Sequence, residues 1–137
     1  LGLHGLEELR SEAQKLAQRI ANINQGLKQA KEIAAANNDP DLAKRVEELQ
    51  ARWEQAVDKQ LPAELKALAK EITAAMKMKQ ENPEAEVMKG KGLKHRLDEL
   101  TQAAVERGVV KVDEEIMALF SQLKIRMPKH GAGDEDE

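Results

Sequence analysis

The stretch "AAANNDPDLAKRVEELQARWEQAV", residues 34–57, shows most directly how the chain is divided into helices. It joins the alanine-rich end of one apolar repeat to a second repeat through Asn-Asn-Asp-Pro. Asp39 is a good N-cap, and Pro40 at the first helical position gives up an N–H group that would have no partner there. Asp41 adds negative charge near the positive end of the helix dipole. The stretch therefore predicts a helix end, a short break and a second helix that begins at Pro40.

The sequence before this stretch has apolar residues at every third or fourth position. This spacing predicts one long helix over residues 6–35 with a narrow apolar seam. The seam consists of Leu6, Leu9, Ala13, Leu16, Ile20, Ile23, Leu27, Ala30 and Ala34. Gly26 falls on the polar side, where we expect it to cost about 1 kcal/mol relative to alanine.

The second helix carries the only tryptophan of the chain, Trp53, and Phe120 is the only other aromatic residue. Trp53 lies on an apolar stripe whose members are Leu42, Val46, Leu49, Trp53, Val57 and Leu61. Because an indole ring buries a large area, we expect Trp53 to anchor the packing of a thin aliphatic core.

Pro62 leaves two alternatives for the end of this helix. The apolar spacing continues beyond it at Leu65, Leu68, Ile72 and Ala75, and no convincing N-cap precedes it. We favour one long second helix that is kinked at Pro62. Two separate helices that meet at "KQLPAE" are the alternative.

Two further helices are predicted in the second half of the chain. Asn82 and Pro83 form a helix start like that at Asp39, but the glycines of "MKGKGLK" soon interrupt it, so a turn or loop is equally expected there. The next helix ends at Gly108 and points Leu93, Leu97, Leu100, Ala104 and Val105 inward. We expect the last helix to begin at Asp113, with Ile116, Leu119, Phe120 and Leu123 inward.

These elements predict an all-α fold, an antiparallel bundle of four or five helices. We expect a single domain over residues 6–127, preceded by a leader or remnant at residues 1–5 and followed by a disordered acidic tail at residues 128–137. An extended coiled-coil dimer is the alternative, because the seam of residues 6–34 also suits pairing between two chains. The sequence leaves monomer and homodimer open.

Composition excludes several classes of function. The net charge of −3 argues against nucleic acid as a partner, because nucleic-acid binding needs a basic face. The absence of cysteine excludes disulfides and thiolate chemistry and fits a reducing compartment. No apolar run is long enough for a transmembrane segment.

No catalytic constellation is recognisable, so we expect a protein that is not an enzyme and holds no cofactor. The histidines are His4, His95 and His130, and we expect none of them to pair with a carboxylate one helical turn away or to bind a metal. The acidic pairs Glu7–Glu8, Glu47–Glu48 and Glu114–Glu115 are expected on solvent-facing sides of their helices.

The strongest local charge feature is a basic patch, Lys89, Lys91, Lys94, His95 and Arg96. Such a patch can attract an acidic peptide or anionic lipid head groups. The alternative is an ordinary solvated surface, because Glu84, Glu86, Asp98 and Glu99 lie nearby and balance the charge. The acidic tail is a second candidate contact, in this case for a basic partner.

The opening stretch also resembles the helical bundles of the vinculin and α-catenin family. In that family an alanine-rich helix end and a short polar break precede a helix with a Trp, an acidic or polar residue and a Val. The residues that carry the likeness are Ala34–Ala36, Asn37–Pro40, Leu42, Ala43, Leu49, Trp53, Glu54 and Val57, within residues 20–60. Spectrin-type repeats also place a Trp on a helix, in phrases similar to "LQARWEQAV".

The resemblance implies a cytoplasmic scaffold that binds the helices of other proteins or cytoskeletal elements, and that links adhesion sites to actin. The expected partner is therefore an amphipathic helix or a cytoskeletal protein. Which face binds does not carry over, because the matched residues are core positions. The alternative function is a structural coiled-coil or spectrin-like rod that serves in dimerisation.

Overall fold

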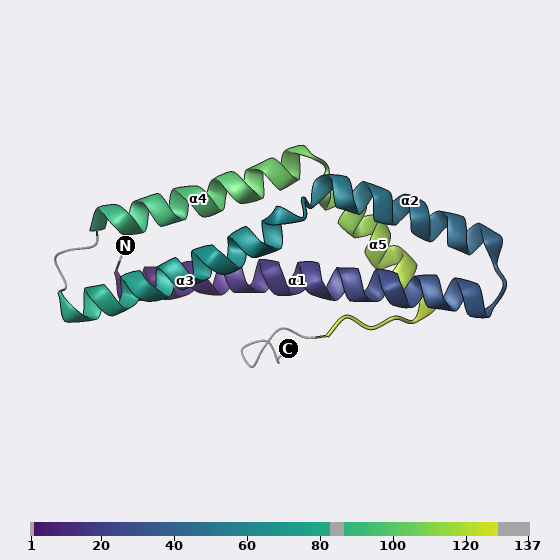
Figure 1. Ribbon diagram of the computed structural model, residues 1–137, viewed down its shortest axis with the longest axis horizontal. Helices are drawn as coiled ribbons and strands as arrows, with labels where there is room; N and C mark the ends of the chain where they lie inside the picture. The colour runs from purple at the N-terminus through teal and green to yellow at the C-terminus, as the bar shows by residue number, and fades with distance from the viewer. Residues whose placement is uncertain (1, 83–86, 129–137) are drawn as a thin grey trace. The chain divides into compact units, whose positions relative to one another are not determined.

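The computed structural model describes residues 2–82 and 87–128 of the chain. These residues form five helices and no strand, so the predicted all-α helical bundle is confirmed. The helices are α1 (Leu3–Ala36), α2 (Pro40–Ala56), α3 (Gln60–Glu81), α4 (Val87–Glu106) and α5 (Val109–Leu123) (Figure 1). Helix α1 begins within the segment that was expected to be a leader. The acidic tail beyond Pro128 lies outside the described residues.

The chain divides into two compact units, and the long helix α1 contributes one half to each. Unit 1 consists of residues 1–18 and 59–103, which include the first half of α1, all of α3 and most of α4. Of the described residues, unit 2 contains 19–58 and 104–128, with the second half of α1, all of α2 and all of α5. Each unit buries its own apolar stripes.

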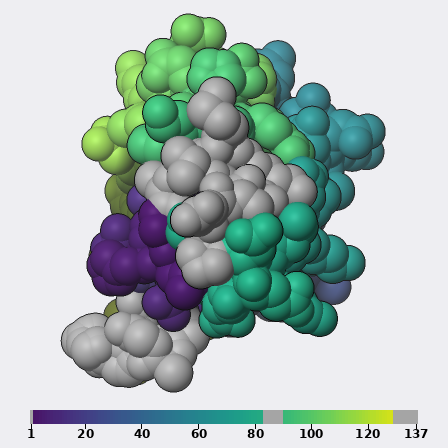
Figure 2. Space-filling model, turned by 90° about the vertical axis from the view of Figure 1, so that its left-hand side faces the viewer, coloured from purple at the N-terminus to yellow at the C-terminus, as the bar shows by residue number. Residues whose placement is uncertain are grey.

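Unit 1 is held together by an aliphatic core and by polar contacts at its surface. The core contains Leu6, Leu9 and Ala13 of α1, Leu65, Leu68 and Ile72 of α3, and Leu93 and Leu97 of α4. Arg10 donates a hydrogen bond to Thr73 Oγ1 at 3.2 Å, which ties α1 to α3. Helix α3 runs back along α1 (Figure 1), and Figure 2 shows the first turns of α1 (purple) and the last turns of α3 (teal) at one end of this unit.

Unit 2 has a core built around the two aromatic residues. Its buried residues include Ile20, Ile23, Leu27, Val46, Leu49, Trp53, Val112, Ile116 and Phe120. Trp53 is only 3% exposed, and its Nε1 atom donates a hydrogen bond to Asn24 Oδ1 at 2.9 Å. Because the indole N–H has a partner on α1, the ring is buried without leaving an unsatisfied donor. Helices α2 and α5 pack against each other.

The junction at residues 34–40 closes α1 and opens α2 through local hydrogen bonds. The N–H of Asn38 donates to the carbonyl of Ala35 at 3.2 Å, and the N–H of Asp39 donates to that of Ala34 at 3.0 Å. These two bonds form a Schellman motif, in which Asn38 takes the left-handed position with φ 49°. The Asp39 side chain then accepts from the N–H of Leu42 at 3.1 Å, which is the predicted N-cap.

Substitution of Asp39 by alanine should lower the free energy of unfolding by about 1 kcal/mol, because an N–H group of the first turn of α2 loses its acceptor. Urea denaturation followed by circular dichroism measures this loss. The matched control is Asp39→Asn, which keeps a side-chain acceptor and should stay close to the wild type. Equal losses in both variants would contradict the role of the side chain as a cap.

The favoured kink at Pro62 is wrong, because α2 and α3 are separate helices. Helix α2 ends at Ala56, and α3 begins at Gln60 with no side-chain hydrogen bond at its N-cap, Lys59. Pro62 is the third residue of α3, where its missing N–H removes no intrahelical bond because the first four N–H groups of a helix have no partner. The break therefore precedes the proline, and no capping side chain marks it in the sequence.

Helix α4 corrects two expectations. It runs through Gly90 and Gly92, where a turn or loop was equally expected. Val105, which was expected to point inward, is 47% exposed. Gly108 ends α4 as predicted, with a left-handed φ of 90°, and its N–H donates to the carbonyl of Val105 at 2.9 Å. The predicted helix start at Pro83 lies outside the described residues.

Helix α5 begins at Val109, four residues before the predicted start at Asp113. The left-handed Gly108 turns the chain, so the helix can start directly after it, and the N–H of Val112 donates to the carbonyl of Gly108 at 3.3 Å. Asp113 is therefore not a cap. Its carboxylate is held by an arginine of α1 instead.

Gly26 corrects the expectation that this glycine lies on the polar side of α1. It is buried, and a Cβ atom at this position would overlap the ring of Phe120 on α5. Because only glycine leaves this space empty, the aromatic ring can pack directly on the backbone of α1.

Candidate functional site

The predicted basic patch lies on the exposed face of α4, where most of its charges have carboxylate neighbours. Lys94 lies 3.3 Å from Asp98, His95 lies 3.3 Å from Glu99, and Arg96 lies 2.7 Å from Glu71 of α3. Lys91 is exposed, and the side chain of Lys89 lies outside the described part of the chain. An acidic ligand would have to compete with these carboxylates, so the geometry favours the balanced surface over a dedicated anion site.

Two of the three histidines have an acidic partner one turn away, contrary to our expectation. His4 lies 3.3 Å from Glu8, and His95 lies 3.3 Å from Glu99. Both pairs are exposed, and the third histidine, His130, lies outside the described residues. Within residues 2–82 and 87–128, no group of three or more His, Cys, Asp or Glu side chains is arranged to hold a metal ion.

A hollow of about 200 Å³ lies beside the basic patch and is lined by Glu64, Arg96, Glu99 and Leu100. Two carboxylates and a guanidinium group line it together with one apolar side chain. The Arg96 guanidinium is already bonded to Glu71, so the hollow presents no convergent set of unpaired groups.

The most specific cluster of polar contacts surrounds α5 in unit 2. Helices α1 and α2 provide the surface on which α5 lies, and we call this surface the α5 seat. Its defining residues are Arg19 and Gly26 of α1, and Arg45 and Arg52 of α2. The sequence interpretation singled out none of these four as site residues.

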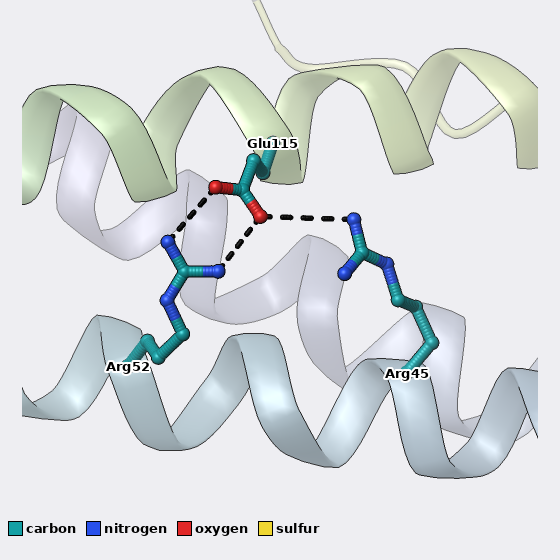
Figure 3. Close-up of polar contacts among 3 residues, drawn as sticks. All are labelled: Arg45, Arg52 and Glu115. Carbon is teal, nitrogen blue, oxygen red and sulfur yellow. Dashed lines mark hydrogen bonds and ion pairs between the residues drawn. The ribbon is translucent and has the colours of Figure 1, made fainter.

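Glu115 of α5 lies between two arginines of the seat (Figure 3). Arg52 donates from Nη1 to Oε1 at 2.7 Å and from Nη2 to Oε2 at 2.9 Å, which is a bidentate pair. Arg45 approaches Oε1 at 3.7 Å. Bidentate pairing fixes orientation as well as distance, so it sets the position of α5 along α2. The expectation that the Glu114–Glu115 pair faces solvent is therefore wrong for Glu115.

Asp113 makes a second bidentate pair, in this case with α1. Arg19 donates from Nε to Oδ2 at 2.9 Å and from Nη2 to Oδ1 at 2.7 Å. The two pairs flank the apolar stripe of α5, whose buried Phe120 ring lies on Gly26. Two charge pairs and one aromatic contact therefore define both the axial position and the rotation of α5 on its seat.

The turn that leads into α5 is attached to the end of α2. Arg107 Nε donates a hydrogen bond to the carbonyl oxygen of Ala56, the last residue of α2, at 3.0 Å. The last carbonyl groups of a helix lack intrahelical partners, so this side chain satisfies one of them. The bond joins the residue before Gly108 to the end of α2.

The Arg52 hydrogen bonds, with smaller contributions from the charges of Arg52, Arg45 and Lys111, lower the pKa of Glu115 below its ordinary value of 4.5, although burial acts in the opposite direction. A carboxyl whose pKa is lower in the folded protein stabilises the fold above its unfolded pKa. That contribution is lost as the pH falls from about 4.5 through the lowered folded value.

The advantage of wild type over Glu115→Gln in urea denaturation should therefore be largest near pH 7 and should shrink below pH 4.5. Denaturation midpoints of both proteins at pH 7, 5, 4 and 3 measure it. The neutral amide cannot titrate, so it removes only this carboxylate from the pH dependence. A difference that stays constant down to the acid transition would contradict the pairing.

The chain matches no protein-family model, no curated protein and no solved structure. Among the described residues, no helix combines the length and the apolar character needed to cross a membrane.

The sequence feature that could have identified the seat is charge complementarity between predicted helices, with arginines on two of them and acidic residues on a third. Asp113 and Glu115 lie on either side of the apolar residues of α5, and the arginines lie beside the apolar stripes of α1 and α2. Each charge alone is typical of a solvent-facing helix side. The arrangement holds α5 of the same chain through two carboxylates and an aromatic ring.

Proposed function

We propose that the chain is a non-enzymatic scaffold module that binds an amphipathic helix of a partner protein. The observation that carries this proposal is the α5 seat, which already recognises one helix through side-chain contacts. Arg19 and Arg52 each form bidentate hydrogen bonds with a carboxylate of α5, and the ring of Phe120 packs on Gly26. The partner of best fit is a helix with two acidic residues beside an apolar stripe that ends in a Phe.

Helix-in-groove recognition uses an apolar face for affinity and flanking charges for orientation. Unit 2 contains both, because α1 and α2 carry buried aliphatic side chains as well as the arginines of the seat. A partner helix would have to displace α5 or bind beside it. The resemblance to vinculin and α-catenin supports a cytoplasmic adaptor linked to the cytoskeleton, with actin as a further candidate partner.

The test is a titration of fluorescein-labelled peptides with the full chain, followed by fluorescence anisotropy. One probe is a synthetic peptide of residues 109–127, and its matched control carries Asp113→Lys and Glu115→Lys. The wild-type peptide should bind about tenfold more tightly or better, since exchanging attraction for repulsion at two pairs exceeds about 1.4 kcal/mol. Raised salt should reduce the difference.

A co-sedimentation assay with filamentous actin tests the cytoskeletal part of the proposal. Sedimentation of the chain with filaments, and none without them, is the expected result. If both peptides bind equally or not at all, the helix-binding function is contradicted. If the chain stays in the supernatant with actin, the direct link to actin is contradicted.

A further inference from the structure

We propose that α5 can leave its own seat and occupy the seat of a second copy of the chain, so that two copies form a dimer by exchanging this helix. The inference goes beyond the proposed function, because it concerns contacts within one protein and requires no other partner. Three observations carry it: the form of the α4–α5 turn, the two valines that would extend the apolar stripe of α5 across that turn, and the specificity of the seat.

The connection between α4 and α5 consists of two residues, Arg107 and Gly108. Both flanking segments are helical, and the left-handed Gly108 is the one residue with positive φ in this turn. Glycine enters the right-handed helical region as readily as the left-handed one. A single change at Gly108 therefore allows α4 and α5 to join into one continuous helix.

Two valines would extend the inner stripe of α5 back across the turn, whereas the buried residues of α4, Leu93, Leu97 and Ala104, lie on a different side of a continuous helix. The buried residues Val112, Ile116 and Leu119 define the inner stripe of α5. Counting back from Val112 by three and then by four residues reaches Val109 and Val105. In a continuous helix these two valines extend the same stripe. Val105 is 47% exposed in the described chain, and the straightened segments of two copies can cover each other there.

The seat makes the exchange specific. Arg19 and Arg52 hold Asp113 and Glu115 at 2.7–2.9 Å, and the same distances can form when α5 comes from a second copy. Exchange of an identical element between copies preserves these native contacts and therefore needs little new interface. Two costs oppose the exchange. The two copies lose translational and rotational freedom when they associate, and the hydrogen bond from Arg107 to the carbonyl of Ala56 is lost. The dimer is thus expected to form at high protein concentration.

The decisive experiment mixes two variants with complementary charges, Arg19→Asp and Asp113→Arg. In each variant alone, positions 19 and 113 carry like charges. In an exchanged heterodimer both contacts become attractive, because the arginine introduced at position 113 of one chain meets the aspartate introduced at position 19 of the other. The two native residues, Asp113 and Arg19, pair at the second seat. Size-exclusion chromatography with light scattering should give 15.2 kDa for each variant alone and twice that mass for the mixture.

The double variant Arg19→Asp/Asp113→Arg is the control, because its pair can form within one chain and it should associate no more than the wild type. If either single variant fails to fold by circular dichroism, Arg52→Glu and Glu115→Arg provide the same test. A mixture that keeps the mass of its components overturns the proposal. So does an equal dimer fraction in the mixture and in each variant alone.

A second test changes a residue of the α4–α5 turn and leaves the seat unchanged. Gly108→Ala makes the left-handed turn unfavourable and the continuous helix favourable, so it should raise the dimer association constant about tenfold or more. Wild type and variant are compared by light scattering over a concentration series. An unchanged or lower association constant contradicts the exchange of α5 through this turn.

Discussion

Substitution of Trp53 by alanine should lower the free energy of unfolding by about 3–5 kcal/mol, the largest effect expected of any single change in this chain. The ring is 3% exposed and lies in a core in which Phe120 is the other aromatic residue. Removing it leaves a cavity in the core of unit 2. The loss of stability is large because the variant loses the free energy gained by burying the ring and also carries the cost of an unfilled cavity.

Urea denaturation followed by far-ultraviolet circular dichroism measures this effect, because the variant lacks the only tryptophan fluorophore. The control Trp53→Phe keeps an aromatic ring but loses the hydrogen bond from Nε1 to Asn24, so a loss of about 1–2 kcal/mol is expected. A loss below about 1 kcal/mol for the alanine variant would contradict the role of Trp53 as the main packing anchor.

Substitution of Gly26 by alanine should also destabilise the protein, by up to about 2 kcal/mol net. Replacing glycine by alanine inside a helix normally stabilises it by about 1 kcal/mol. Here the new Cβ atom would overlap the ring of the buried Phe120, and such overpacking typically costs about 1–3 kcal/mol. Steric overlap therefore outweighs helix propensity at this position.

The matched control is Gly92→Ala in α4, where a Cβ atom would meet nothing within 4 Å. That variant should be more stable than wild type by about 0.5–1 kcal/mol. The double variant Gly26→Ala/Phe120→Leu should recover part of the loss, since the smaller side chain makes room. Two alanine variants that shift the urea midpoint in the same direction would contradict the packing of Phe120 on Gly26.

The helix boundaries that depend on local chemistry could be predicted from the sequence. Asp39 caps α2 with its own side chain, and Gly108 ends α4 by a left-handed conformation that favours glycine. The break before Pro62 could not be predicted in the same way, because Lys59 makes no side-chain cap there. The capping contact at the end of α2 comes instead from Arg107, which is 51 residues away in the sequence.

The residues of the α5 seat and of α5 also divide into those whose role local sequence predicts and those whose role depends on a distant residue. Glu115 and Gly26 read as ordinary polar-side residues when each helix is considered alone. Their roles depend on Arg52 and Phe120, which are distant in the sequence and come close only after the helices pack. A periodic pattern states which residues of a helix face inward. It does not state which residue of another helix each one meets.

Local sequence chemistry was therefore enough to predict the helical class, most members of the apolar stripes, the junction at residues 37–40 and the helix end at Gly108. These features follow from backbone propensity, capping and side-chain period, which act over a few neighbouring residues. The end of α2, the pairing of the acidic residues of α5 and the need for glycine at position 26 became clear only from the packed helices. Each of these depends on side chains from different helices meeting at hydrogen-bonding or van der Waals distance, and the packing of the helices creates that proximity.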